Sequence, residues 1–193
     1  MRKGIVLLLP LLLILAACGP IIGQLMRVAD GVKNFQVVGG DLSSLRKGAH
    51  VLVVGPFDLA PGAWEIARGD EAALFATEFN RAEFFNAELH MGDRYAPAAK
   101  GIAEAKAKSA AQLKADYGLE AEPDVLMFAT VLNRDTIVAP ARGVIMEVAY
   151  QLEFFNPATG KSAVVRVTVR EQFKDCIKLV VAELTRQVLA ASL

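Results

Sequence analysis

Few residues in this chain combine a reactive type with the spacing that chemistry requires. The two cysteines, Cys18 and Cys176, lie far apart, and the two histidines, His50 and His90, each lie beside a predicted strand. A structural zinc site needs several cysteine or histidine ligands at short spacing, and neither histidine has such a partner. The sequence also lacks a glycine-rich phosphate loop, an HExxH motif and a CxxC motif. We therefore expect no metal and no cofactor.

Carboxylates offer another route to catalysis. Glycoside hydrolysis uses two carboxyl groups that flank one bond, and the candidates here are Glu83, Glu88, Asp93 and Asp124. Charged residues at the ends of strands and helices are usually solvated. The serines have none of the surroundings of a catalytic nucleophile. We therefore expect no catalytic residue and a protein that is not an enzyme.

Cys18 follows a distinctive leader. Arg2 and Lys3 precede an apolar run from Ile5 to Leu15 that is too short to span a membrane comfortably. The run ends in Leu15-Ala16-Ala17-Cys18, which resembles a bacterial lipobox, the motif at which signal peptidase II cuts before the cysteine. Two alternatives are an uncleaved membrane anchor and a chance cysteine at the end of an ordinary signal peptide.

The lipobox resemblance implies a specific division of the chain. Residues 1–17 would be a lipoprotein signal peptide, with Leu15, Ala16 and Ala17 recognised by the peptidase. The sulfur of Cys18 would carry diacylglycerol with acyl chains such as palmitate. Residues 18–49 would be the lipidated cysteine and a tether, and residues 50–193 a periplasmic α/β domain.

Composition agrees with one folded domain and argues against a nucleic-acid partner. Removing the first 17 of the 193 residues leaves 176, enough for a sizeable core. The 21 basic and 21 acidic side chains balance, and losing the two basic residues of the leader leaves a net charge of −2. Binding to nucleic acid requires a concentrated basic face. With Cys18 lipidated, Cys176 has no partner for a disulfide, and we expect it to be buried as a small apolar residue.

The tether contains too many apolar residues to be a freely solvated linker. Glycines interrupt it repeatedly, yet the stretch from Ile21 to Phe35 is largely apolar. It either covers the domain, which we favour, or lies against lipid or a partner. Residues 41–47 predict a short helical turn.

The first half of the domain alternates strands with helices. Residues 51–54 and 125–132 are continuously apolar, which predicts two strands covered on both faces. Helical periodicity from Asp70 predicts a helix that ends near Phe84-Phe85. Alternation over residues 85–91 predicts a strand with one polar face, either at an edge or in a half-covered position. Residues 98–117 predict a second helix, which Gly118 ends.

The last third of the chain predicts a hairpin and a final helix. If Asn156 pairs with Lys161, apolar residues face each other on one side of the two strands, while Glu147 faces Arg170 on the other. A slip of one residue would set apolar against polar residues at every pair. Asp175 predicts the start of a helix whose buried face is Ile177, Val180, Val181, Leu184 and Val188.

The elements together predict a mixed α/β fold, with one mixed sheet in the order β-α-β-α-β-β-β-α and helices packed on it. This order resembles the small α/β domain of the TolB amino-terminal region, which also occurs in envelope lipoproteins such as CsgG, PelC and LpoB. The matching segments are Val53-Val54-Gly55-Pro56-Phe57, Ala115-Asp116-Tyr117, Pro123-Asp124-Val125-Leu126 and residues 152–161 with Thr159-Gly160.

The resemblance implies a role in the cell envelope. Gly19 follows Cys18 where enterobacterial sorting would read an aspartate as a signal to remain at the inner membrane, so the resemblance implies the periplasmic face of the outer membrane. We expect a lipid-anchored, non-catalytic binding or assembly accessory of an envelope complex that serves export or a cell-surface structure. A structural envelope lipoprotein is one alternative. A hydrolase acting on an envelope polymer is a less favoured one.

CsgG-like and PelC-like relatives also form rings, so the resemblance makes a homo-oligomer one expected arrangement alongside other envelope partners. A ring needs a head-to-tail contact that closes. The candidate patches are the apolar tether and a predicted loop over residues 133–142. In that loop Ile137 and Val138 form an apolar centre between Arg134 and Arg142, as in many interfaces. The alternative is that Ile137 and Val138 tuck under the sheet.

Overall fold

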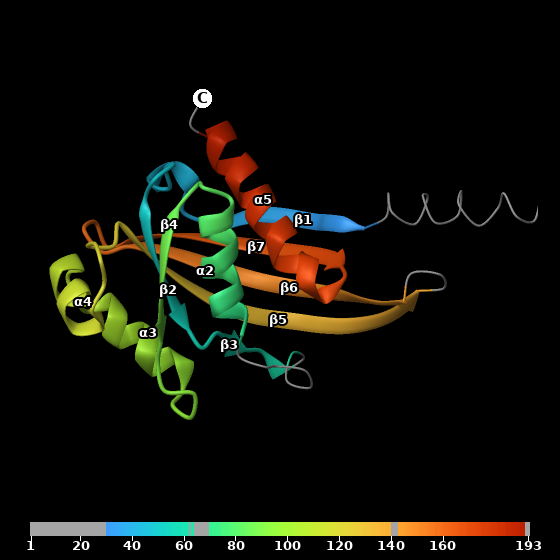
Figure 1. Cartoon of the computed structure of the whole chain (residues 1–193), viewed down its shortest axis with the longest axis horizontal. Coiled ribbons are helices and arrows are strands. Elements are labelled where there is room, and N and C mark those ends of the chain that lie inside the picture. Colours follow the sequence, from blue (N-terminus) through green and yellow to red (C-terminus); the bar gives the residue numbers. More distant parts are fainter. Residues whose placement is uncertain (1–29, 62, 64–69, 140–142, 192–193) are drawn as a thin grey trace, which may run out of the picture.

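The computed structural model describes residues 30–61, 63, 70–139 and 143–191. They form one mixed sheet of seven strands with four α-helices packed against it (Figure 1). The fold class predicted from the sequence is therefore confirmed. The strands are β1 (Gly31–Gly39), β2 (His50–Gly55), β3 (Asp58–Leu59), β4 (Asn86–Met91), β5 (Val125–Ala139), β6 (Gly143–Asn156) and β7 (Lys161–Glu171). The helices are α2 (Glu71–Arg81), α3 (Ala98–Lys106), α4 (Ala110–Tyr117) and α5 (Phe173–Ala191), with a short 3-10 helix η1 (Leu42–Ser44).

The sheet has two halves of different construction. Its strand order is β1-β7-β6-β5-β2-β4, and β3 pairs with β5 beside this path. β2 runs parallel to β4 and to the start of β5, whereas β5, β6, β7 and β1 pair antiparallel in succession. We refer to β4, β2 and residues 125–131 of β5 as the parallel half, and to the rest of β5 with β6, β7 and β1 as the antiparallel half.

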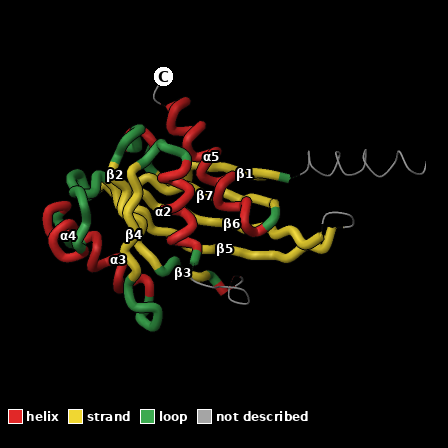
Figure 2. The backbone as a smooth tube through the Cα atoms, in the orientation of Figure 1, coloured by secondary structure: helices red, strands yellow, loops and turns green. Residues whose placement is uncertain are grey.

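β2 and the start of β5 are covered on both faces, as their apolar runs predicted, whereas β4 lies at the edge of the sheet. Val51 and Val53 of β2 face the main core, with α2 and α5. Leu52 and Val54 face a second, smaller core, which includes Ala105 of α3 and Leu113 of α4. Figure 2 shows α2 and α5 lying across the sheet, while α3 and α4 lie at the end remote from the β5–β6 turn.

The antiparallel half has the predicted register. Asn156 pairs with Lys161, Tyr150 with Val167, and Glu147 with Arg170. Apolar side chains of β6 and β7 point into the main core, where α5 buries Ile177, Val180, Val181, Leu184 and Val188. The other face carries polar side chains, among which Arg170 Nε donates to Glu147 Oε2 at 2.7 Å and Arg166 Nε donates to Gln151 Oε1 at 3.0 Å.

The sequence places residues 31–39 in the tether, but they form the edge strand β1, paired with β7. The sheet thus begins before residue 50. The register shifts twice, between Val32 and Asn34 and between Val37 and Gly39. Such bulges break the two-residue alternation that identifies a strand. The predicted turn after it is confirmed as η1, where the Asp41 side chain accepts from the Ser43 backbone N–H.

Three helix predictions also need correction. Residues 98–117 form two helices, because Ser109 starts a new one: its hydroxyl accepts from the Gln112 backbone N–H, and the Gln112 side chain accepts from the Ser109 N–H. This reciprocal pair is a capping box. The last helix begins at Phe173, so Asp175 lies in its first turn and is not its cap. The helix predicted to end near residue 85 ends at Arg81.

The predicted loop over residues 133–142 is largely strand. β5 continues to Ala139 and β6 begins at Gly143, with Ile137 opposite Ile145 and Val138 opposite Val144. Residues 140–142 lie outside the described residues. Figure 1 shows this hairpin extending past the amino end of α5.

Candidate functional site

The residues singled out at the start of the chain lie outside the part that the structure describes. These are Leu15, Ala16, Ala17 and Cys18, so the lipobox remains a prediction from sequence. Arg142, the second charged residue of the candidate interface, also lies outside the described residues. None of the described helices has the length and apolar character needed to cross a membrane.

Arg134 does not form the rim of an exposed patch. Its side chain is buried and pairs with the buried carboxylate of Glu71 at the start of α2. A bulge between Val131 and Asn133 shifts the alternation of β5 by one residue, and Arg134 then lies opposite Val148, whose side chain is in the main core. Arg134 is therefore part of the interior that joins β5 to α2.

Val138, in contrast, is exposed. Its side chain is 77% exposed, and that of its cross-strand partner Val144 is 57% exposed. Ile137 is half-buried beside its partner Ile145, which is buried. The two valines form a small apolar patch near the end of the β5–β6 hairpin, which we call the hairpin patch. Val138 is thus the one residue of the predicted interface that is exposed among those described, and Val144 is an exposed neighbour that was not predicted.

A second candidate site is a cleft of about 200 Å³ at the carboxyl ends of the parallel strands. Ligands of open α/β sheets commonly bind at this position. Val54, His90 and Phe128 line it from β2, β4 and β5, and α3 lines it with Ala98 and Gly101. We call it the α3 cleft. Sequence reasoning missed it, although Ala98, Gly101 and Ala105 repeat small residues along one side of the helix.

His90 is held at the edge of this cleft by aromatic stacking. Its ring lies parallel to that of Tyr117 in α4, with centroids 3.7 Å apart and an interplanar angle of 12°. The Lys108 ammonium lies 4.6 Å from the centroid of the Tyr117 ring. The same ammonium forms an ion pair with Asp116 at 2.7 Å. Burial, with a smaller contribution from Lys108, lowers the pKa of His90 below 6.5. The imidazole is therefore neutral at neutral pH.

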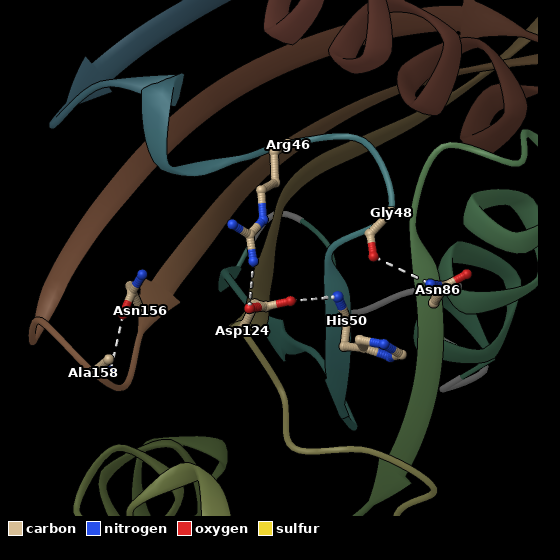
Figure 3. Close-up of polar contacts among 7 residues, drawn as sticks. All are labelled: Arg46, Gly48, His50, Asn86, Asp124, Asn156 and Ala158. Carbon is tan, nitrogen blue, oxygen red and sulfur yellow. Dashed lines mark hydrogen bonds and ion pairs between the residues drawn. The ribbon is translucent and has the colours of Figure 1, made fainter.

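Three of the four carboxylates considered for catalysis, Asp124, Glu88 and Asp93, bind separate backbone segments. Asp124 lies at the amino end of β5, where Oδ2 accepts from the His50 backbone N–H at 2.9 Å and Oδ1 from Arg46 at 3.1 Å (Figure 3). Glu88 accepts from the backbone of Glu120 at 2.9 Å, and Asp93 from that of Tyr95 at 2.9 Å. Each thus stabilises a different loop or strand end.

Figure 3 shows that the surroundings of His50 are structural as well. The His50 ring points away from Asp124, and Asn86 Nδ2 donates to the Gly48 carbonyl at 3.1 Å. These contacts tie the amino ends of β2, β4 and β5 together. Among the described residues, no group of three His, Cys, Asp or Glu side chains is arranged to hold a metal ion.

Cys176 is buried at the start of α5, as expected for a small apolar residue. Its thiol donates to the Glu171 carbonyl oxygen at 3.5 Å. Burial raises the pKa of the thiol to about 11. The thiolate needed for nucleophilic or redox chemistry is therefore scarce at neutral pH.

No protein-family model matches the chain, and no curated protein matches its sequence. Solved structures give distant likenesses. A PelC dodecamer from Paraburkholderia phytofirmans has a TM-score of 0.46 and 13% identity, covering 81% of this chain and 94% of that one. The lipoprotein GNA1162 from Neisseria meningitidis has a TM-score of 0.38 and 18% identity, covering 74% and 96%. The hypothetical protein CT253 from Chlamydia trachomatis has a TM-score of 0.36 and 14% identity, covering 75% and 95%. Likenesses at this level assign neither a family nor a function.

Proposed function

We propose that this protein is a lipid-anchored, non-catalytic module of a bacterial envelope, which binds partner proteins close to the membrane. The leader and Cys18 support the anchor. The main support for the binding role is the direction in which the chain enters the domain. This direction determines how close the hairpin patch lies to the lipid anchor.

Strand register gives that direction. Gly31 of β1 pairs with Arg170 of β7, Arg170 pairs with Glu147 of β6, and Glu147 pairs with Asp135 of β5. β1 thus begins at the end of the sheet from which the β5–β6 hairpin projects (Figure 1). The twelve residues from Gly19 to Asp30 can span at most about 40 Å. A domain anchored through Cys18 would therefore carry its hairpin patch within reach of the membrane surface.

The chemistry of the described residues also favours binding over catalysis. The candidate carboxylates serve separate loops and Cys176 is buried, whereas the exposed valines of the hairpin offer an apolar contact. In this proposal the partner is a protein of an outer-membrane export or surface complex, met on the periplasmic side. A second copy of the chain is one such partner.

The anchor is tested by replacing Cys18. Cys18→Ser should abolish incorporation of a labelled palmitate analogue and should leave the chain uncleaved or released from membranes. Cys176→Ala is the matched control, because it removes the other thiol and should leave labelling intact. A Cys18→Ser chain that is still cleaved and still fractionates with membranes would contradict the anchor.

The binding role is tested by photo-crosslinking at two ends of the antiparallel half. A crosslinker at position 138 lies in the hairpin patch, and one at position 159 lies in the exposed turn between β6 and β7 at the opposite end. We expect position 138 to give discrete crosslinks to envelope proteins or to a second copy in intact cells. Equal crosslinking from both positions would contradict a partner at the hairpin.

A further inference from the structure

The α3 cleft exists because one face of α3 carries small residues at every position except Ile102. Ala98, Gly101, Ile102 and Ala105 follow the helical spacing of i, i+3, i+4 and i+7, which places them on one face. Ala105 is buried against the smaller core, while a Cβ added at Gly101 would meet no atom within 4 Å. The carboxyl half of α3 thus packs on the sheet, and the amino half leaves space beneath it.

The floor of this space is one row of side chains across three adjacent parallel strands. Val54 pairs in register with His90, and Phe128 follows Met127, which pairs with Val53. The row therefore runs from an aromatic ring through an aliphatic side chain to an imidazole. Lys106 Nζ lies 5.3 Å from the centroid of the Phe128 ring and is also bound to Glu153. These contacts hold the carboxyl end of α3 over the sheet.

The charged residues that line the cleft, Lys100, Glu104 and Asp93, are exposed. Lys100 and Glu104 are mostly exposed and pair with each other at 3.9 Å. Within the cleft, His90 provides a half-buried hydrogen-bonding group. A neutral imidazole has one N–H donor and one acceptor nitrogen. The remaining walls include Pro56, Ile102 and Phe128, which are apolar.

We propose that the α3 cleft binds a single aromatic ring that carries one hydrogen-bonding group, such as a phenol or an indole. The ring would lie between α3 and the row of Val54 and Phe128, with its polar group on His90. A flat ring suits this slot because aromatic groups gain from packing against the face or edge of another ring. The same chemistry can come from a free small molecule or from a tyrosine or tryptophan side chain of a partner.

This inference stands apart from the proposed function. The cleft lies at the ends of β2 and β4, beside α3, whereas the hairpin patch lies at the far end of β5 (Figure 1). Loss of the anchor or of the hairpin contact would leave the cleft intact. An experiment that contradicts one of the two proposals therefore leaves the other untouched.

The test is a ligand-detected NMR titration of the full-length protein in lipid nanodiscs, with empty nanodiscs as background. The probes are p-cresol and toluene, which differ by one hydroxyl group. We expect saturable binding of p-cresol with a Kd of roughly 1 mM, which suits a ligand of this size. Toluene should bind about three- to tenfold more weakly, because it lacks the hydrogen bond.

Variants locate the binding. Gly101→Leu should fill the cleft and abolish saturable binding, whereas Ala103→Leu adds the same side chain on the exposed side of α3 and should leave it unchanged. Ala98→Leu is a second filling variant for use if Gly101→Leu fails to fold by circular dichroism. His90→Phe preserves a ring that can stack on Tyr117 and should remove the preference for p-cresol over toluene.

A short peptide with one central tyrosine distinguishes the two sources. Competition between this peptide and p-cresol would assign the cleft to a partner's side chain, and p-cresol binding without competition would assign it to a free small molecule. Absence of saturable p-cresol binding to the folded wild-type protein would overturn the proposal. Equal binding by wild type and the folded filling variant would overturn it as well.

Discussion

The two halves of the sheet differ in how many of their faces are exposed to solvent. In the parallel half, β2 is buried between two helical layers, and its side chains alternate between the main core and the smaller core. In the antiparallel half, one face packs on α2 and α5, while the other carries polar side chains such as Glu147 and Arg170. The hairpin then extends past the amino end of α5 (Figure 1). The parallel half can therefore enclose a ligand, whereas the antiparallel half can only present a surface.

The buried pair of Glu71 and Arg134 joins α2 to the antiparallel half, and breaking it should have the largest effect. Glu71→Leu or Arg134→Met alone breaks this pair and leaves its other charged group in the interior. Such single changes typically cost about 3–5 kcal/mol of stability. We expect a loss of this size in the free energy of unfolding from urea titration.

The double variant Glu71→Leu/Arg134→Met separates the charge from the packing. Replacing a whole buried ion pair by apolar residues is often nearly neutral, so the double variant should be more stable than either single variant. A double variant whose loss equals the sum of the single losses would show that the two charges do not act on each other.

Local pattern predicted those parts of the fold in which neighbouring residues carry the information. The register of β6 and β7 followed from the sequence because one alignment pairs apolar with apolar residues and Glu147 with Arg170. The burial of β2 followed from an unbroken apolar run. In each case the decisive residues lie on one strand or on two strands joined by a short turn.

The features that sequence reasoning missed depend on residues that are far apart in the sequence. Arg134 looks like a surface residue until Glu71, 63 positions away, is brought beside it. β1 gains its strand conformation from β7, and its bulges obscure the alternation. The α3 cleft depends on Gly101 facing the row of Val54 and His90. In the sequence alone, the small residues of α3 are typical of any solvent-exposed helix.

The second prediction concerns α3 and α4, the helices that cover the parallel half on the side of the smaller core. Ser109→Ala removes the hydroxyl that caps α4 and should destabilise the protein by about 1 kcal/mol. The loss is measured as a lower midpoint of urea unfolding. Ser109→Asp retains an acceptor at the cap and is the matched control. Equal losses from both variants would mean that the capping bond is not the source of stability at this position.

The third prediction uses the lowered pKa of His90. The unfolded chain takes up this proton near pH 6.5, whereas the folded protein takes it up only at lower pH. The unfolded state therefore binds more protons between these two values. Stability should fall as the pH drops from 6.5 toward the lower pKa of the folded state.

Two variants test this assignment. His90→Phe keeps an aromatic ring beside Tyr117 but cannot titrate, so its stability should depend less on pH across this window. Tyr117→Phe retains both His90 and a stacking ring, and should retain the wild-type dependence. If His90→Phe and wild type lose stability in parallel, another group is responsible.

The smallest effect on stability is expected at the hairpin patch, and it gives the sharpest contrast between the halves. Val138→Ser and Val144→Ser change side chains that are already largely exposed, so each should alter the free energy of unfolding by no more than about 0.5 kcal/mol. Leu126→Ala, in the buried start of the same strand β5, should cost about 2–5 kcal/mol, because it leaves a cavity in the smaller core. Urea unfolding of the three variants makes the comparison. A loss above about 1 kcal/mol at Val138 would mean that this valine is held in the folded interior, and the hairpin could then not serve as a free contact surface.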